Sequence, residues 1–186
     1  MYISPMKAIK LGWITHPNCK ELSDWEDRKY LNPNAIDFTV DKMFSIAGHN
    51  RFVISESDKT MRGGHEIKPV QGRLPSREGV EYWNLVGKGV WDCLSDAYVK
   101  IPEGVACELI IRSTFARNGC YLTSGLYDSG FEGHIGFAFH SRCSGGVHLA
   151  PGTRIGQIRF VQSASYGVYE GQYNHAEGTN AHQADE

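Results

Sequence analysis

The sequence lacks a strong charge of either sign, a long apolar run and a paired cysteine motif, and each absence excludes a class of protein. Its 186 residues carry a formal net charge of −2, so no general basic field exists to hold a nucleic-acid backbone. No apolar run approaches the roughly 20 residues that a membrane-spanning helix needs, and the first residues lack the apolar core and cleavage site of a signal peptide. We therefore expect a cytoplasmic protein that binds neither a membrane nor a nucleic-acid polymer.

Cysteine and histidine are present but are not spaced for cross-linking or metal binding. The five cysteines are odd in number and form no CxxC pair, which argues against a disulfide framework or a structural zinc site and favours a reducing compartment. The histidines show neither HxH nor HxxxH spacing. We therefore expect no metal held by protein ligands alone.

Glycine, with 21 residues, and the aromatic residues are plentiful, which suits short strands and tight turns better than a helical bundle. Strands are predicted over residues 97–101, 105–112, 133–139 and 154–161, and a short helix over residues 6–12. Regularly spaced short strands indicate a sandwich, jelly roll or barrel. The length of the chain suits a single domain, residues 1–186, of the mainly β class.

Three further segments are distinguished by composition. Within residues 31–46, Ile36, Phe38 and Val40 alternate with polar or small neighbours, which predicts a half-buried strand. Residues 56–80 are polar and contain glycine and proline, and we interpret them as a loop or an arm over the surface. From about residue 171 the chain is again polar, which predicts a flexible C-terminal arm that orders when a ligand binds.

Three motifs carry the chemistry. RSTFAR, residues 112–117, offers two guanidinium groups and two hydroxyls at the end of a predicted strand, and arginine binds phosphate oxygens in a bidentate manner. TSGLYDSGFEGHIG, residues 123–136, is a glycine-rich hairpin that a flat base could approach closely, with Asp128 in its middle. PGTRIGQ, residues 151–157, ends in the amide of Gln157, which could reach a phosphate or a sugar.

These motifs, in this order, resemble the dCTP deaminase/dUTPase superfamily. The upstream stretch LNPNAIDF, residues 31–38, is similar to an early strand of that family, so the resemblance runs from about residue 7 to about residue 180. It implies a distorted jelly roll or β-barrel of the dUTPase type with a short N-terminal helix. It also implies a homotrimer whose active sites are shared between subunits.

The resemblance implies roles for particular residues. Asp128, Arg117 and Ser113 would be catalytic, with Asp128 meeting the 3′-hydroxyl of the deoxyribose and orienting the attacking water. Phe131 would lie near the sugar, and the backbone of residues 123–127 would read the base edge. The residues expected to bind the substrate are Arg112, Ser113, Thr114, Thr123, Ser124, Gly125, Tyr127, Phe131, Gln157, Gln172 and Tyr173.

One departure from the family pattern bears on the reaction. Deaminating members are similar to one another in carrying a glutamate in the strand after the hairpin, where it acts as the general base for the water that attacks the cytosine ring. The matching strand here reads GHIGFAF and has Ala138 at that position. Alanine has no proton to move, and members that cleave dUTP have a small apolar residue there. The resemblance therefore favours cleavage of dUTP.

The C-terminal stretch is a second departure. Gln172 and Ala176 stand where deaminating members have lysine and glutamine. The stretch does not resemble the arginine- and glycine-rich arm of typical dUTP-cleaving members either. The base and the number of phosphates on the substrate are therefore left open.

The sequence thus predicts a hydrolase that converts dUTP to dUMP and pyrophosphate. Its substrate would be a pyrimidine deoxyribonucleotide, with Mg²⁺ carried by the nucleotide phosphates. Three alternatives stay open: a dCTP deaminase, alone or combined with dUTP cleavage; a non-catalytic relative that binds a nucleotide or a partner protein; and a structural jelly roll with a fortuitous match.

Simpler interpretations exist for single residues. Asp128 could serve only as a turn residue, because Asp-Ser-Gly favours turns. Arg112 and Arg117 could be surface charges or partners in an ion pair between subunits. Arg154, which leads into a predicted strand, is interpreted as structural.

Overall fold

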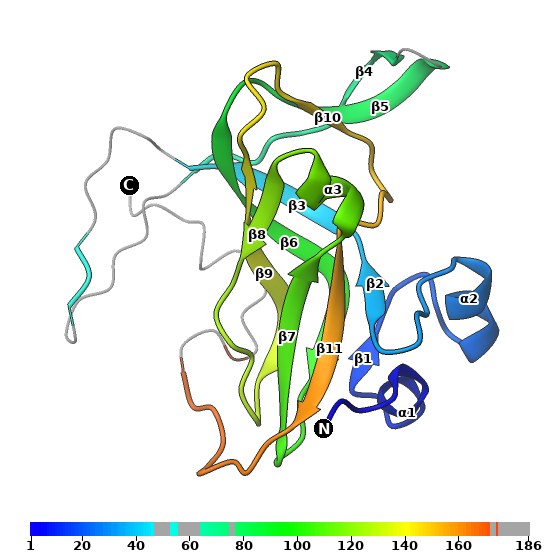
Figure 1. The fold of residues 1–186 in the computed structure, drawn as a ribbon, viewed down its shortest axis with the longest axis vertical. Helices are drawn as coiled ribbons and strands as arrows, with labels where there is room; N and C mark the ends of the chain where they lie inside the picture. The colour runs from blue at the N-terminus through cyan, green and yellow to red at the C-terminus, as the bar shows by residue number, and fades with distance from the viewer. Residues whose placement is uncertain (47–52, 56–63, 75–76, 172–173, 175–186) are drawn as a thin grey trace.

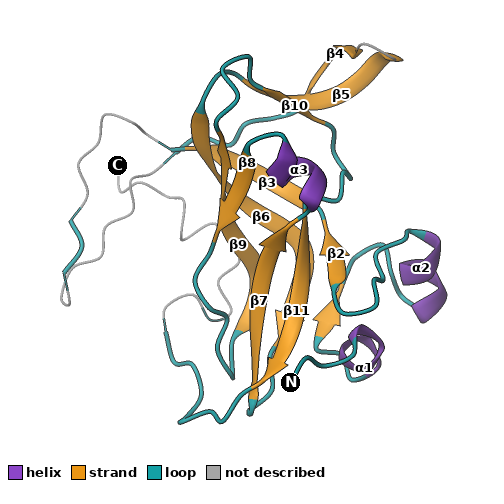
Figure 2. Cartoon of the chain, viewed as in Figure 1, coloured by secondary structure: helices purple, strands orange, loops and turns teal. Residues whose placement is uncertain are grey.

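The computed structural model describes residues 1–46, 53–55, 64–74, 77–171 and 174. Antiparallel strands dominate, and the helices are short (Figures 1 and 2). The mainly β prediction and the short N-terminal helix are therefore confirmed. The elements are α1 (Pro5–Lys10), β1 (Ile14–Thr15), α2 (Leu22–Asp27), β2 (Ile36–Phe38), β3 (Val40–Ser45), β4 (Val70–Leu74), β5 (Arg77–Leu85), β6 (Gly89–Lys100), β7 (Val105–Ile111), α3 (Ser113–Arg117), β8 (Cys120–Thr123), β9 (Glu132–Ser141), β10 (Val147–Leu149) and β11 (Gly156–Gln162).

In the described residues the strands form two facing sheets and a third sheet. One sheet has the order β1-β6-β9-β8, with β3 also paired to β6, and the second has the order β2-β11-β7. Figure 2 shows β7 and β11 in front of β6 and β9. Inward-pointing aromatic residues join the two layers: the rings of Phe38 on β2 and Phe137 on β9 are 5.3 Å apart and edge-on, and both are buried.

Alternation along the central strands explains this arrangement. In β9 the residues Ile135, Phe137 and Phe139 are buried, and their neighbours are partly or fully exposed. A strand with this period of two presents one face to a core and the other to solvent. The predicted strands over residues 105–112, 133–139 and 154–161 match β7, β9 and β11, and each end differs by no more than two residues. The predicted strand over residues 97–101 covers only the end of the longer β6.

The half-buried strand predicted within residues 31–46 is corrected in two respects. The segment contains two strands, β2 and β3, and not one. The polar residues Asp37 and Thr39 are 2% and 1% exposed, as deeply buried as the apolar residues Ile36, Phe38 and Val40 next to them. Burial of polar side chains is tolerated only where hydrogen bonds or ion pairs satisfy them, and both residues have such partners.

The surface loop predicted over residues 56–80 is wrong from residue 70 onward. There, β4 and β5 pair as antiparallel strands, and β10 adds to β5 to complete the third sheet. This sheet extends beyond the sandwich at one end (Figure 1). The register shifts between Gly72 and Leu74, and this irregularity, together with nearby prolines, hides the strands from a pattern search. Residues 56–63 lie outside the described residues.

The N-terminal segment is fixed to the sandwich by a buried histidine. The amide of Asn18 donates to His16 Nδ1, which leaves the proton of a neutral ring on Nε2, 3.0 Å from Asp96 Oδ2 on β6. Thr39 donates its hydroxyl to the same oxygen. Burial disfavours the charged form of Asp96, but the hydrogen bonds from His16 and Thr39 outweigh it and hold the pKa of this carboxyl below its usual range.

In the described part of the chain, no helix has the length and apolar character that crossing a membrane requires.

We expect Asp96→Asn to lower the free energy of unfolding by about 2 kcal/mol at pH 7, because it removes a charged acceptor of two buried hydrogen bonds. A carboxyl whose pKa is lower in the folded protein than in the unfolded chain stabilises the fold at pH values above its unfolded pKa, here 3.8. This stabilisation is lost as the pH falls through the folded pKa. Urea unfolding at a series of pH values should therefore show a constant difference from wild type between pH 8 and 5, and a shrinking one below about pH 4. A difference that did not change with pH would contradict this assignment.

Candidate functional site

The RSTFAR motif, which the sequence analysis predicts to bind phosphate, lies where β7, β11 and β2 of the second sheet meet. The β7–β11 ladder pairs Ile111 with Gly156, and the amide of Arg112 continues it by donating to the carbonyl of Ile155 at 3.0 Å. On the other side of β11, Gln157 pairs with Asp37 of β2. The ladder therefore brings side chains from two of the sequence motifs together around Asp37.

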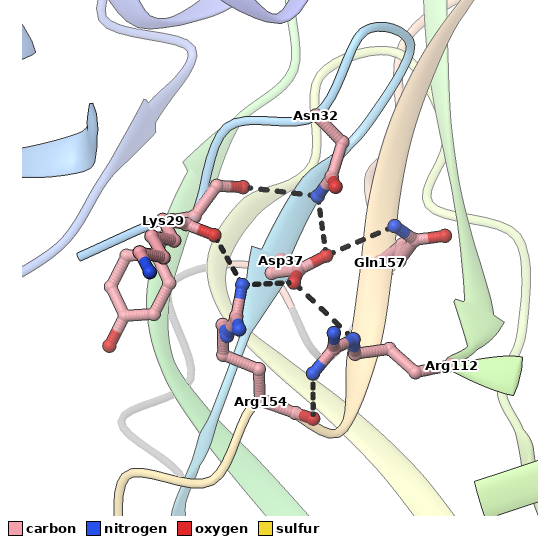
Figure 3. A network of polar contacts seen from close by, with 7 residues as sticks. Lys29, Asn32, Asp37, Arg112, Arg154 and Gln157 are labelled. Atoms are coloured by element: carbon pink, nitrogen blue, oxygen red, sulfur yellow. Dashed lines mark hydrogen bonds and ion pairs between the residues drawn. The ribbon is translucent and has the colours of Figure 1, made fainter. Parts of the chain in front are cut away.

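Asp37 is the centre of a polar network (Figure 3). Its side chain is only 1% exposed and accepts four contacts. The donors are Asn32 Nδ2 at 2.6 Å, Gln157 Nε2 at 3.0 Å, an Arg154 terminal nitrogen at 3.2 Å and Arg112 Nε at 3.4 Å. All the acceptor positions of this buried carboxylate therefore face a donor, as a buried charge requires.

The network has an excess of positive charge. One carboxylate faces the guanidinium groups of Arg112 and Arg154, whose side chains are 31% and 29% exposed. Arg112 also donates to the carbonyl of Arg154, and Arg154 to that of Lys29, so both groups are held in place and still reach solvent. A guanidinium has five N–H donors, more than these contacts use. The arrangement is suited to binding an anion such as a phosphate.

The other predicted residues of the RSTFAR motif form the helix α3, which the sequence analysis did not predict. Ser113 and Thr114 lie exposed at its first turn, directly after Arg112. Arg117 is its last residue and is exposed; among the described residues no polar partner for its side chain is recorded. Ser113 and Thr114 thus follow directly on Arg112 of the Asp37 network, whereas Arg117 stands at the other end of the helix.

Asp128 begins a tight turn and keeps an exposed side chain. The amide of Phe131 donates to the carbonyl of Asp128 at 3.1 Å, and Gly130, with a φ of +87°, takes the left-handed conformation in between. The interpretation of Asp128 as a turn residue is therefore correct for its backbone. Its carboxylate points to solvent and has no recorded partner within the described residues, so it is free to meet a ligand.

The aromatic residues next to Asp128 are buried in this chain. Tyr127 and Phe131 are 8% and 7% exposed, and their rings are 5.0 Å apart. The backbone of Tyr127 exchanges hydrogen bonds with Cys107, and its hydroxyl donates to the carbonyl of Gly136. Burial raises the pKa of Tyr127 far above its usual value. The amide of Tyr127 is thus already committed, whereas Thr123, Ser124 and Gly125 are exposed; their contacts with a nucleotide stay predictions.

A row of three residues crosses the outer face of the first sheet. Ala138 on β9 lies directly opposite Thr123 on β8 and Asp92 on β6. Directly opposed residues of antiparallel strands point to the same face, with Cβ atoms about 5 Å apart. Next to this row, His140 Nε2 lies 2.9 Å from the Thr123 hydroxyl and its ring stacks on Tyr121 at 4.4 Å. Partial burial lowers the pKa of His140.

Within one chain the candidate residues form two groups that lie apart: the residues around Arg112, and the residues around Asp128. Tyr127 pairs with Cys107 near the start of β7, whereas Arg112 follows its end. A strand rises about 3.3 Å per residue, so Asp128 and Arg112 are separated by roughly 20 Å along this strand. Figure 1 shows α3 at the end of β7 that is remote from its start. One chain therefore presents the two groups toward opposite ends of β7.

The sequence did not single out Asp37, Asn32 and Asp92 as candidate site residues. The signal for Asp37 was a carboxylate inside an otherwise apolar stretch, a residue type that is buried only when it is paired. Asp92 could be recognised only from the register of β6 on β9.

The predicted substrate-binding residues Gln172 and Tyr173 lie outside the described residues. Within the ranges that the structure describes, no three His, Cys, Asp or Glu side chains gather into a group that could hold a metal.

Comparisons with known proteins agree with these motifs. A family model described as dCTP deaminase-like matches residues 95–163. A deoxyuridine 5′-triphosphate nucleotidohydrolase of Methanocaldococcus jannaschii is 30% identical over 155 residues, which cover 83% of this chain and 93% of the relative. A dUMP-forming dCTP deaminase of Bifidobacterium animalis is 30% identical over 149 residues, 77% of this chain and 72% of the relative.

A solved structure supports the same fold. The 2′-deoxycytidine 5′-triphosphate deaminase of Agrobacterium tumefaciens superposes with a TM-score of 0.58 at 14% sequence identity, over 86% of this chain. The chain spans about half the length of that protein, 47%. The architecture of two antiparallel sheets, the order of the three motifs and the similarity to relatives of both kinds lead to one conclusion: the chain belongs to the dCTP deaminase/dUTPase superfamily.

Proposed function

We propose that the protein is an enzyme that hydrolyses dUTP to dUMP and pyrophosphate. The observation that carries this choice is Ala138. Its side chain stands between Thr123 and Asp92 on the outer face of the sheet, at the position where the resemblance places the general base of deaminating members, and it can neither accept nor donate a proton. Relatives named as dUTP nucleotidohydrolases and as dCTP deaminases are similarly distant, so the choice rests on this residue.

The phosphate chain would lie along the exposed side of the Asp37 network. Arg112 and Arg154 would donate to phosphate oxygens, and the hydroxyls of Ser113 and Thr114 would add neutral donors beside them. Because the guanidinium groups are already fixed by Asp37 and by backbone carbonyls, little reorganisation is needed as negative charge develops in the transition state. Any Mg²⁺ would arrive on the nucleotide phosphates as part of the substrate.

Asp128 would act on the attacking water. Its exposed carboxylate would accept the proton of a water molecule whose oxygen attacks the α-phosphorus. The bond from that phosphorus to the oxygen bridging to the β-phosphate would break, and pyrophosphate would leave. The separation of roughly 20 Å along β7 supports an arrangement in which the carboxylate and the arginines of one site would come from different copies of the chain, as the family resemblance implies. We therefore propose a homotrimer with shared sites.

A second candidate, deamination of dCTP, is favoured by one observation. Asp92 lies directly across from Ala138 and on the same face, so its Cβ atom lies about 5 Å from that of Ala138, the position of the missing base. In this reaction a water oxygen would attack the ring carbon that bears the amino group, and ammonia would leave. Asp92 would accept the proton of that water.

The first test is a product assay. Purified protein with Mg²⁺ is expected to form dUMP and pyrophosphate from dUTP, and Asp128→Asn is expected to lower kcat by at least about 100-fold with nucleotide binding largely retained, because only the general base is removed. Asp27→Asn, at an exposed residue of α2, is the matched control and should behave as wild type. Full activity of Asp128→Asn would refute the assigned role, and absence of products from dUTP would refute the proposed reaction.

The Asp37 network gives a second expectation. Asp37→Asn removes the one buried charge that balances two guanidinium groups, and should lower the free energy of unfolding by about 3 kcal/mol while raising the KM for dUTP. Glu108→Gln, which breaks the exposed ion pair with Arg159, should cost less than about 1 kcal/mol and leave the KM unchanged. Urea unfolding and steady-state kinetics of both variants provide the measurement. Equal effects of the two substitutions would mean that Asp37 does not organise the site.

The deamination candidate is tested by ammonia release from dCTP. If wild type releases ammonia, Asp92→Asn should lower the rate by about 100-fold or more and leave dUTP hydrolysis within about twofold, since Asp92 has no part in phosphate cleavage. Ammonia release that survives in Asp92→Asn would exclude Asp92 as the base. No ammonia from the wild-type protein would exclude the deamination candidate altogether.

A further inference from the structure

The turn that carries Asp128 is held between the sandwich and the C-terminal part of the chain. On the sandwich side, Gly130 donates its amide to the carbonyl of Ile101 at 2.8 Å, and the amide of Ile101 donates to the carbonyl of Phe131 at 2.9 Å. The hydroxyl of Ser129 donates to the carbonyl of Val105 at 2.7 Å. These contacts fix one side of the turn to the loop between β6 and β7.

The other side of the turn is covered by residues 165–171 and Asn174, which we call the C-terminal clasp. The amide of Tyr169 donates to the carbonyl of Ser129 at 2.6 Å, and the hydroxyls of Ser165 and Ser129 are hydrogen-bonded. The rings of Tyr169 and Phe131 are 5.8 Å apart. Every residue of the turn after Asp128 therefore has a partner either in the clasp or across the turn.

Asn174 closes the clasp at the first residue of β9. Its side-chain oxygen accepts the amide of Glu132 at 2.7 Å, and its own amide donates to the carbonyl of Gly171 at 3.2 Å. Asn174 thus contacts both Gly171 of the clasp and the first residue of β9. Among the described clasp residues, only Asn174 accepts a hydrogen bond from a backbone amide of β9, and it does so with its side chain.

The fit between the clasp and the turn is tight. A Cβ atom added at Gly130 would lie 2.8 Å from Val168 Cβ and 3.1 Å from the Tyr169 amide nitrogen. Yet the clasp has no helix or strand of its own, and Tyr166 and Val168 remain exposed. Its position therefore depends on the contacts with the turn, and these contacts hold the side of the turn that faces away from Ile101 and Val105.

From these contacts we infer that the C-terminal clasp sets the position of the Asp128 carboxylate, with Ser165, Tyr169 and Asn174 as positioning residues. Asp128 has no recorded side-chain partner among the described residues, so only its backbone orients it. Displacement of a reacting group by about 1 Å can cost a factor of about 100 in rate. This inference rests on the proposed role of Asp128 in hydrolysis. The clasp would change the turnover rate through the position of Asp128, without touching the reacting atoms itself.

The test compares three substitutions of the clasp in the full-length protein. Asn174→Ala removes the acceptor of the Glu132 amide and should lower kcat for dUTP by about tenfold with KM changed less than about twofold. Asn174→Asp keeps a side-chain acceptor and should restore kcat to within about threefold of wild type, because hydrogen bonds to a charged acceptor are no weaker. Tyr169→Ala, which removes the ring against Phe131, should resemble Asn174→Ala. Asn84→Ala, at an exposed residue of β5, is the matched control.

Amide hydrogen exchange supplies a readout that does not require activity. The Glu132 amide should exchange at least about tenfold faster in Asn174→Ala, because the loss of a hydrogen bond allows local opening, and at nearly the wild-type rate in Asn174→Asp. If wild type does not hydrolyse dUTP, the proposed function fails, while the exchange result still tests whether the clasp holds the turn. Unchanged exchange and kcat in Asn174→Ala would overturn the inference. A raised KM with unchanged kcat would also overturn it, because the clasp would then act on binding and not on the position of Asp128.

Discussion

The buried carboxylate of Asp37 is the constraint on which the second sheet depends. A charge removed from water is tolerated only when its partners compensate the loss of hydration. Asp37 draws those partners from four segments: Asn32 before β2, Arg112 after β7, Arg154 before β11 and Gln157 within β11. The pairing of β2 on β11, and the position of the chain where it leaves β7, therefore follow from one ionic centre. The same centre holds two partly exposed guanidinium groups, so the interaction that stabilises the fold also shapes the proposed anion-binding surface.

Strand β7 determines how the chemical groups are distributed. Seven consecutive residue pairs join it to β11, and such a ladder is too rigid to bring its two ends together. The arginines and hydroxyls lie beyond one end, and the Asp128 turn lies beside the other. The chain thus presents two proposed half-sites at opposite ends of β7. In the proposed trimer a complete site arises where the half-sites of neighbouring copies meet, and the buried aromatic residues next to Asp128 serve to fix its turn.

The sequence identified the residues whose signals are local, and it missed those whose partners are remote. Arg112, Ser113, Thr114 and Asp128 were singled out as candidates because each lies in a short motif at a strand end or turn, and Ala138 because its motif has a fixed spacing; their roles stay predictions. Asp37, by contrast, has partners 75 or more positions away except for Asn32, and Asp96 meets Thr39 across 57 positions. Tyr127 and Phe131 were expected to face a nucleotide. Their burial could not be read from the motif, because an aromatic residue beside a turn can point either inward or outward.

The sequence by itself determined the mainly β class, the short N-terminal helix, three of the central strands and the turn at Asp128, since alternation and turn chemistry act between residues close in the chain. Only the tertiary structure decided that Asp37 is shared by two arginines, that Asp92 faces Ala138, that the C-terminal clasp covers the Asp128 turn, and that the two half-sites lie apart. Each of these depends on strand register or on contacts between distant segments. Register is selected by which side chains can be buried together across the whole sandwich, and a local pattern does not contain that information.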